Sequence, residues 1–412
     1  MDSLLAVRDA QGKILQVFSP KPLVEIDLEQ AFHRILAQPV RASQDLPAFA
    51  NSSMDGFAVR SQDVTAASPD QPVWLEIIQD IPAGSVPRIA NGPQQASRIM
   101  TGAPLPDGAD AVIPVEEAAL HPSGSRVAFH RPVSPGQYIR PIGQDIRRGE
   151  QVLPAGKELT PQDIGLIASL GLAKITVFST PRVAIFSSGD ELIQPGQPIS
   201  PGKIYDANHY VLSGLLRDAG AEVIDLGTAR DSLQDITAHL DEAVRSGADL
   251  ILSSAGVSVG DYDFVRQVIN RNGHLDFWRV NMRPGKPVAF GDYRGIPFLG
   301  LPGNPVSAFV GCQVFTLPVV RKLRGADPFQ REERQATLLE PVESDGRESY
   351  LRVHAGYLAG QLSVRLTGHQ GSGNLYALSQ ANALLILPSG VKSLPAGSTA
   401  SIWLLGNLAD EI

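Results

Sequence analysis

The spacing of apolar positions changes several times along the chain and divides it into regions. From Pro181 to about residue 324, short apolar runs alternate with stretches whose apolar residues lie three or four apart. This alternation predicts a Rossmann-like α/β domain. It carries no G-x-G-x-x-G fingerprint that would imply a dinucleotide. The predicted strands are 183–186, 223–226, 250–252, 277–282, 287–290 and 296–299, and the predicted helices are 207–219, 232–246, 262–270 and about 306–324.

Two other regions are rich in short β-type runs separated by Gly and Pro. Residues 47–145, with Val73–Ile78 as an example, predict a small β domain inserted between helical parts. Residues 331–412 predict a small barrel or sandwich. Residues 1–20 carry a poor signal and predict a short strand or a mobile arm.

Two predicted helices flank the inserted β region. Asp27 followed by Gln30 has the form of a capping box and predicts a helix that Pro39 ends. Thr160, with Pro161 at the first helical position, predicts a second helix that stops before Gly171. We expect these parts to form one helical linker domain, residues 22–46 and 146–178.

Composition narrows the classes of function. The chain has 412 residues, 43% of them hydrophobic, and a formal charge of −8, which predicts several buried cores and argues against non-specific nucleic-acid binding. Its single cysteine, Cys312, excludes an intramolecular disulfide and argues against a thiolate zinc site. The apolar run 306–320 is interrupted by Gln313 and Pro318, so we expect a buried helix and no membrane span. With no signal peptide visible, we expect a cytoplasmic protein.

The stretch Ala248–Val265 carries the first candidate chemistry. A predicted strand leads into a Gly/Ser loop and then a helix start, a geometry that aims backbone N–H groups at an anion. Asp261 and Asp263 beside the loop would repel a phosphate, so a divalent cation between them is expected. A loop that merely turns the chain is the alternative. The Gly/Ser loop that would supply these donors contains Ser254, Gly256, Ser258 and Gly260.

Cationic residues supply the second candidate feature. Arg283 and Lys286 stand in a turn stiffened by Pro and Gly, which favours a preorganised anion grip, although a plain surface turn is locally more common. Arg352 lies in a predicted strand, and its local pattern favours a solvent-facing side chain. Asp55-Gly56 and Thr101-Gly102 have the local form of turns.

Taken together and in order, these clusters resemble the molybdenum insertase family, of the MoeA and gephyrin E-domain type. The resemblance covers about residues 22–390. The matching stretches are NSSMDGFAV (51–59), RIMTGAPLPDGADAVIPVEE (98–117), RPIGQDIRRGE (140–150), SSGDEL (187–192), YDANHYVL (205–212), SSAGVSVGDYDFV (253–265), MRPGKPVAFG (282–291), LGLPGNPVSAFV (299–310) and ALSQANALLILP (377–388).

The resemblance implies a multidomain protein and a reaction. The implied domains are the helical linker, the inserted β domain at 47–145, a Rossmann-like (MogA-like) molybdopterin-binding α/β domain at 179–327 and a C-terminal β-barrel at 328–412. It also implies a homodimer whose active site is shared between the α/β domain of one subunit and the β domain of the other. Adenylylated molybdopterin and molybdate are the implied substrates, Mg²⁺ the implied cofactor, AMP the released product, and a molybdopterin adenylyltransferase a further partner.

The resemblance also assigns roles to residues. The residues implied to act in the reaction are Asp55, Thr101, Glu191 and Asp261. The substrate is implied to be bound by the Gly/Ser loop together with Arg283, Lys286, Pro302 and Asn304. Molybdate is implied to be bound by Arg352, Ser372 and Gly373, and Mg²⁺ by Glu191, Asp261 and Asp263.

One departure and two alternatives accompany this interpretation. The family commonly has glycine where Ala255 stands, and alanine there is tolerated only if its φ is negative. A molybdopterin adenylyltransferase shares the α/β domain, but its resemblance would extend to that domain alone. A non-enzymatic scaffold dimer, as in gephyrin, is the other alternative.

Overall fold

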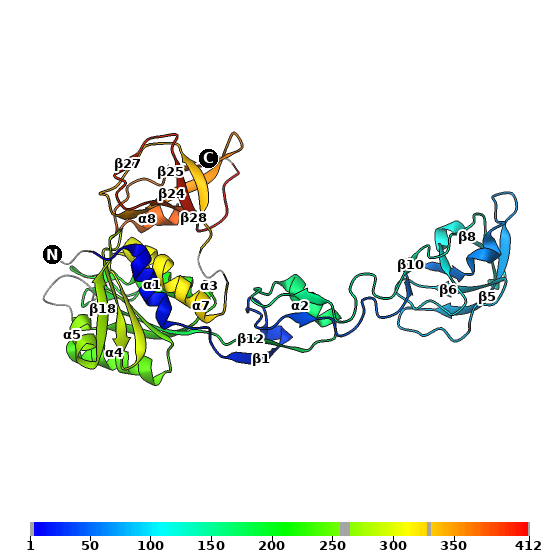
Figure 1. Cartoon of the computed structure of the whole chain (residues 1–412), viewed down its shortest axis with the longest axis horizontal. Coiled ribbons are helices and arrows are strands. Elements are labelled where there is room, and N and C mark those ends of the chain that lie inside the picture. Colours follow the sequence, from blue (N-terminus) through cyan, green and yellow to red (C-terminus); the bar gives the residue numbers. More distant parts are fainter. Residues whose placement is uncertain (1–3, 256–263, 328–330, 411–412) are drawn as a thin grey trace. The chain divides into compact units, whose positions relative to one another are not determined.

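The computed structural model describes residues 4–255, 264–327 and 331–410 (Figure 1). The chain forms two compact units. Unit 1 comprises Met1–Ala37, Gly156–Leu159 and Ile175–Ile412, and unit 2 comprises Gln38–Ala155 and Thr160–Lys174. The predicted domain boundaries remain a prediction.

The α/β part of unit 1 is a six-stranded sheet of order β16-β13-β17-β21-β20-β18. The first four strands run parallel, and the last two continue the sheet antiparallel. Each predicted strand is therefore present, and all four parallel strands point their carboxyl ends to one edge. The strands are β13 (Arg182–Ser188), β16 (Glu222–Ala229), β17 (Leu250–Ser254), β18 (Gly273–Arg279), β20 (Pro287–Tyr293) and β21 (Ile296–Leu301).

Helices cover both faces of this sheet because its central strands are apolar on both sides. Val183 and Ile185 of β13 face one core, whereas Ala184 and Phe186 face the other. The helices are α1 (Val7–Val17), α3 (Ala207–Asp218), α6 (Pro305–Gly311) and α7 (Leu317–Leu323) on the first core and α4 (Leu233–Arg245) and α5 (Phe264–Asn272) on the second.

The N-terminal segment is a helix, so the prediction of a strand or mobile arm over residues 1–20 is wrong. Its buried residues Val7, Ala10, Ile14 and Leu15 recur with helical spacing and join the first core. The side chain of Gln11 donates to the carbonyl of Val314 at 2.9 Å.

The apolar stretch after Asn304 forms one long buried helix, as predicted. A π-helical segment, η4 (Cys312–Thr316), joins α6 to α7. Residues Pro305–Leu323 are long and apolar enough to span a membrane by length and composition, but 83% of that stretch is buried inside the protein. It is therefore a core helix.

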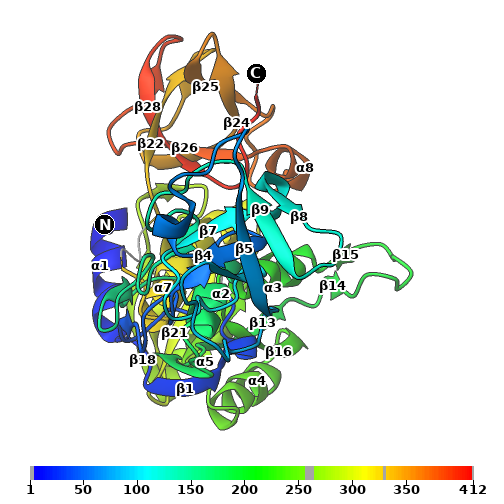
Figure 2. The same cartoon turned by 90° about the vertical axis from the view of Figure 1, so that its right-hand side faces the viewer.

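The C-terminal part of unit 1 is a closed β-barrel. Its strands follow the order β24-β25-β22-β28-β26, and β26 also pairs with β24, which closes the ring (Figure 2). A short strand, β19 (Met282–Arg283), runs from the α/β part and pairs with β24. The barrel elements are β22 (Arg334–Leu338), β24 (Glu348–Leu358), β25 (Gln361–Leu366), α8 (Leu375–Ser379), β26 (Ala383–Leu387) and β28 (Thr399–Leu404), with the side pair β23 (Val342–Glu343) and β27 (Ser393–Leu394).

The helix predicted from Asp27 does not form. Only a single 3-10 turn, η1 (Leu28–Gln30), follows, and the Asp27 side chain does not cap it. The next residues pair with distant backbone instead: Leu36 N–H donates to Lys157 at 2.9 Å, and Ala37 N–H donates to Thr176 at 3.0 Å. Two further two-stranded sheets are present among the described residues. One pairs β1 (Leu23–Asp27) with β12 (Lys174–Phe178), and the other pairs β14 (Leu192–Ile193) with β15 (Ile204–Tyr205).

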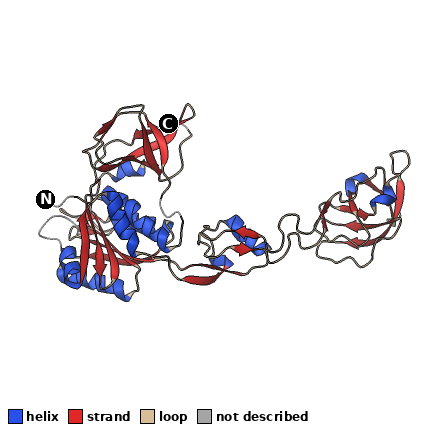
Figure 3. Ribbon diagram, in the orientation of Figure 1, coloured by secondary structure: helices blue, strands red, loops and turns tan. Residues whose placement is uncertain are grey.

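Unit 2 contains the predicted small β region and one helix. A six-stranded sheet of order β7-β4-β6-β5-β9-β8 forms its core (Figure 3). Helix α2 (Pro161–Ser169) begins at the predicted N-cap, Thr160, which bonds reciprocally with Asp163 in a capping box. The other elements are β2 (Val40–Arg41), β3 (Asn51–Ser52), β4 (Gly56–Val59), η2 (Ser61–Val64), β5 (Val73–Ile81), β6 (Gln95–Ile99), β7 (Ala111–Pro114), η3 (Val115–Glu117), β8 (Ala118–Leu120), β9 (Arg126–Phe129), β10 (Ile139–Arg140) and β11 (Gln151–Leu153).

Candidate functional site

The loops at the carboxyl edge of the parallel strands are held together by one amide. Nδ2 of Asn208, in the first turn of α3, donates to Oγ of Ser254 at 2.7 Å and to the carbonyl of Gly303 at 2.7 Å. Ser254 ends β17, and Gly303 follows β21. The amide therefore fixes the spacing of two predicted ligand loops, at the edge where open α/β sheets bind ligands.

Several buried polar atoms at this edge have no hydrogen-bond partner among the described residues. They include the hydroxyls of Ser187, Ser188 and Ser253 and Oδ1 of Asn208. Buried polar groups without partners are costly in a folded protein. Their concentration at one edge favours a site that a polar ligand completes.

The Gly/Ser loop itself is described only at its start. Gly256, Ser258, Gly260, Asp261 and Asp263 lie outside the described residues, so their predicted roles stay predictions. Ala255 has a φ of +72°, in the left-handed region that favours glycine. The condition for tolerating alanine here, a negative φ, is not met, so the loop carries local strain.

Three carboxylates gather where β13 and β16 end. The backbone N–H of Asp231 donates to Oδ1 of Asp190 at 3.3 Å, and the N–H of Asp190 donates to Oδ2 of Asp231 at 3.4 Å. Burial raises the pKa of Asp231 above its ordinary value, and repulsion from Asp190 and Glu191 raises it further against the lowering effect of the backbone bond. Sequence reasoning selected Glu191 but missed Asp231, which follows β16 at the same edge of the sheet.

The described residues show no group of three or more His, Cys, Asp or Glu side chains already arranged around a metal position. Carboxylate oxygens are the kind of ligand that suits Mg²⁺, and the repulsion of Asp231 by Asp190 and Glu191 is of the kind that a divalent cation relieves.

Arg352 is the largest fully buried side chain, with 0% of its surface exposed. Its Nη2 donates to the carbonyls of His369 and Gly371 at 3.2 and 3.0 Å, while Nε and Nη1 have no partner among the described residues. Burial, and secondly the nearby charge of Arg283, lower the pKa of Arg352 to about 10, so it stays cationic at neutral pH. The expectation of a solvent-facing Arg352 is wrong.

Two cations therefore meet where the α/β part joins the barrel. The pairing of β19 with β24 places Arg283 opposite Ser349, three residues before Arg352. Arg283 is close enough to Asp345 to lower the pKa of that carboxyl, whereas Nε and Nη1 of Arg352 have no partner among the described residues. An anion beside Arg352 would stabilise this pair of cations.

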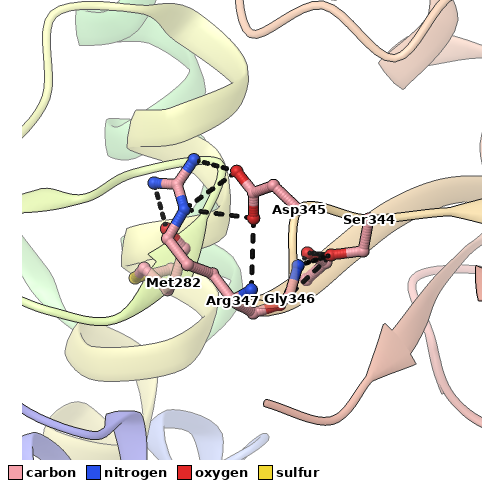
Figure 4. Close-up of polar contacts among 6 residues, drawn as sticks. Met282, Ser344, Asp345, Gly346 and Arg347 are labelled. Atoms are coloured by element: carbon pink, nitrogen blue, oxygen red, sulfur yellow. Dashed lines mark hydrogen bonds and ion pairs between the residues drawn. The ribbon is translucent and has the colours of Figure 1, made fainter. Parts of the chain in front are cut away.

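The junction is held by a clamp of three residues. Arg347 donates through Nη1 to the carbonyl of Met282 at 3.1 Å and through Nε to both carboxylate oxygens of Asp345 at 3.2 and 3.0 Å (Figure 4). These bonds to Arg347 lower the pKa of Asp345. The clamp fixes Met282, and with it the position of the neighbouring Arg283.

Gln370 forms two hydrogen bonds to the backbone of Arg352, and the sequence did not predict this role for Gln370. Its Oε1 accepts from Arg352 N–H at 2.8 Å, and its Nε2 donates to the Arg352 carbonyl at 3.1 Å. The carbonyl of Ser372 accepts from Val306 N–H at 3.0 Å, which ties the barrel loop to the start of α6. The predicted molybdate residues Arg352, Ser372 and Gly373 thus lie on adjoining backbone.

The other predicted substrate residues differ in exposure. Pro302 is buried, whereas Lys286 and Asn304 are exposed. Asn304 precedes α6, and its side chain makes no capping bond, so its amide is available to a ligand.

In unit 2, Asp55 and Thr101 are directly bonded. Oδ1 of Asp55 accepts from the backbone N–H of Thr101 at 2.7 Å and from its hydroxyl at 2.8 Å. The backbone bond first, and the hydroxyl bond second, lower the pKa of Asp55 below its ordinary value. The structure therefore pairs two residues that the sequence selected separately.

Comparisons with known protein families cover nearly the whole chain in three consecutive matches. Residues 5–171 match the MoeA N-terminal region (domain I and II), residues 184–322 match the probable molybdopterin binding domain, and residues 335–405 match the MoeA C-terminal region (domain IV). The fold and these matches define a protein of molybdenum cofactor biosynthesis.

Full-length relatives specify the family. Molybdopterin molybdenumtransferase 2 of Mycobacterium tuberculosis is 38% identical over 97% of this chain and 99% of its own length, and the molybdopterin molybdenumtransferase of Haemophilus influenzae is 35% identical over 97% and 98%. The crystal structure of the molybdopterin biosynthesis MoeA protein from Pyrococcus horikoshii superimposes with a TM-score of 0.81 at 30% identity, covering 98% of this chain and 100% of that one. The chain belongs to the MoeA family of molybdopterin molybdenumtransferases.

Proposed function

We propose that this chain takes adenylylated molybdopterin as its substrate, exchanges the adenylate for molybdenum from molybdate, and releases AMP. Membership of the molybdopterin molybdenumtransferases makes molybdenum insertion into molybdopterin its activity. The single observation that carries the finer proposal is Arg352, a fully buried guanidinium with two nitrogens unpartnered among the described residues and a second cation nearby. A tetrahedral oxyanion such as molybdate satisfies both its charge and its hydrogen bonds.

The phosphate groups of the substrate require a separate set of contacts. Ser254, the start of α6 at Asn304, and Arg283 with Lys286 supply hydroxyl, amide and cationic donors at the edge of the sheet. The remaining loop residues, Gly256, Ser258 and Gly260, are assigned by resemblance. Donors of this kind bind phosphate oxygens and hold the reacting anhydride in place.

Mg²⁺ is proposed as the cofactor. Glu191 and Asp231, with Asp261 and Asp263 assigned by resemblance, would hold it. A bound divalent cation there neutralises phosphate charge beside carboxylates that otherwise repel it. Burial is the first cause of the raised pKa of Asp231; the smaller contribution, repulsion from Asp190 and Glu191, is one that a bound cation would relieve and supports the assignment.

Asp55 and Thr101 are proposed to act at the anhydride. Asp55 stays ionised because Thr101 donates two hydrogen bonds to it, so it can orient a cation or an attacking water. The Thr101 hydroxyl donates to Asp55 in this structure, so its proposed bond to the leaving phosphate requires it to exchange partners.

We further propose a cytoplasmic homodimer in which Asp55 and Thr101 of one subunit complete the site of the other. A functional partner that supplies adenylylated molybdopterin, such as a molybdopterin adenylyltransferase, is part of the same proposal. Neither nucleic acid nor a membrane is needed by this reaction.

Complementation tests the shared site. Asp55→Ala and Arg352→Ala are each expected to abolish AMP release from adenylylated molybdopterin in the presence of molybdate and Mg²⁺. Dissociating and re-associating an equal mixture should restore about a quarter of wild-type activity, because half of the dimers are mixed and each mixed dimer has one intact site of two. No recovery despite demonstrated mixed dimers would contradict the shared site.

A second arginine of the barrel serves as the control for the proposed role of Arg352. Arg365 lies exposed on β25 of the same barrel. Arg365→Ala should release AMP at the wild-type rate, whereas Arg352→Ala should not. Undiminished AMP release and molybdenum insertion by a folded Arg352→Ala protein would refute the proposed molybdate role.

A further inference from the structure

A cavity of about 530 Å³ lies between α3, the α6–α7 helix and the barrel, and none of the candidate-site residues lines it. Its size is within the range of small-molecule sites, about 300–1,000 Å³. One wall is apolar and comes from three different helices. The main apolar residues are Leu215, Phe309, Leu317, Leu375 and Leu378.

Charged residues also line this cavity, and the three arginines outnumber the two carboxylates, Glu158 and Asp218. Arg321, Arg324 and Arg331 line it. Arg324 is committed to the fold, because it is only 8% exposed and its guanidinium donates to the carbonyls of Ala219 and His33. It also lies 3.4 Å from Glu158, the carboxylate nearest to it.

Arg331 does not have a comparable set of hydrogen bonds among the described residues. Its Nη1 is buried and has no hydrogen-bond partner in the part of the chain that the structure describes. Burial, and then repulsion from Arg321, lower its pKa to about 10 against the opposing effect of Asp218. Burial and Arg324 likewise lower the pKa of Arg321. Arg331 therefore stays cationic at neutral pH, and Glu158 offsets part of the lowering at Arg321 as Asp218 does at Arg331.

We propose that this cavity binds a small organic anion whose apolar body lies against the leucines and Phe309 and whose anionic head is held by Arg331 and Arg321. The partnerless buried nitrogen requires an acceptor, and guanidinium groups bind carboxylate and phosphate oxygens with two bonds. The apolar wall excludes a bare inorganic anion as the best-fitting ligand. The proposal goes beyond molybdenum insertion and does not depend on it.

Octanoate is a suitable probe, because it combines a carboxylate with an apolar chain. Isothermal titration of the full-length protein should show one saturable site per chain. Octan-1-ol, which lacks the carboxylate, and acetate, which lacks the long apolar chain, should each bind at least tenfold more weakly than octanoate. Equal affinity for octan-1-ol and octanoate would overturn the role of the arginines.

Matched variants locate the site. Arg331→Leu should weaken octanoate binding at least tenfold, and Arg331→Lys, which keeps the charge, should weaken it less. Arg271→Leu, an exposed residue of α5 on the other face of the sheet, should leave binding unchanged, as should Arg352→Ala. Loss of binding in Arg352→Ala would place octanoate in the candidate site and overturn the proposal, as would wild-type affinity in Arg331→Leu. Octanoate binding that weakens as protein concentration rises would show that a second chain fills the cavity. That result would also overturn the proposal.

Discussion

Asp55 and Thr101 lie 46 positions apart in the sequence, yet one carboxylate oxygen of Asp55 accepts both the backbone N–H and the hydroxyl of Thr101, at 2.7 and 2.8 Å. Both bonds favour the ionised carboxylate. Asp55 is therefore held as an anion with a fixed orientation, and its second oxygen accepts no hydrogen bond from the described residues.

Removing the hydroxyl alone should change the titration of Asp55 in part. Thr101→Val keeps the backbone bond, which is the larger cause of the lowered pKa, and removes the side-chain bond. We expect the pKa of Asp55 to rise but to stay below its ordinary value. The associated stabilisation is present above the ordinary aspartate pKa and is lost as pH falls through the lowered pKa. Carboxyl carbon NMR titration measures this; an unchanged pKa would remove Thr101 Oγ1 as a contributor.

Gln370 should act through Arg352 as a positioning residue. Gln370→Ala removes both bonds to the Arg352 backbone, for an expected cost of about 1–3 kcal/mol in stability. We also expect the molybdate concentration for half-maximal activity to rise several-fold with a smaller change in kcat. Gln370→Glu keeps the acceptor for Arg352 N–H and should recover part of the molybdate affinity. A loss of stability with an unaltered molybdate requirement would make Gln370 structural only.

Ala255 should be replaceable by glycine with a gain in stability. Its φ of +72° strains a residue with a Cβ, so Ala255→Gly should raise the free energy of unfolding by about 1 kcal/mol. The control is Ala238→Gly at an exposed position of α4, where glycine should lower stability by about 1 kcal/mol. Thermal unfolding of both variants measures the contrast, and destabilisation by Ala255→Gly would contradict the strain.

Asp231→Asn should have opposite effects with and without Mg²⁺. The substitution removes a negative charge that Asp190 and Glu191 repel, so the metal-free protein should gain thermal stability. Mg²⁺ affinity should fall about tenfold, because a carboxylate is a stronger ligand than an amide. In the wild type, protonation of Asp231 at its raised pKa should weaken Mg²⁺ binding as pH falls. Metal titrations at several pH values check both, with Asp70→Asn, an exposed residue of unit 2, as the unaffected control.

Local signals predicted those elements whose determinants are local. The helix predicted to start at Thr160 formed as expected, because Thr160 and Asp163 satisfy each other within one turn. The similar pattern at Asp27 failed because the chain beyond it pairs with backbone near residues 157 and 176, and such distant pairing has no signature in the segment itself. Helix α1 differs, because Val7, Ala10, Ile14 and Leu15 have helical spacing in the sequence and the local signal was missed.

The candidate site was predictable in its residue types but not in its contacts. The rule that ligand loops follow parallel strands located Ser254 and the loop before α6. The burial of Arg352 was not predictable from strand alternation. Its neighbours Leu351 and Val353 face the barrel core, while Tyr350, on the same face of the strand as Arg352, packs against the core of the α/β part. Domain packing buries both faces of this strand, so the arginine is enclosed as well.

The position of molybdenum tests the central claim most directly. A crystal soaked with molybdate, AMP and Mg²⁺ should show an anomalous peak from molybdenum within hydrogen-bonding distance of the Arg352 guanidinium and beside Ser372, with AMP at the edge of the sheet near Ser254. The peak should disappear in Arg352→Ala and persist in Arg365→Ala. An ordered molybdate bound elsewhere, with the Arg352 guanidinium left without an anion, would contradict the account.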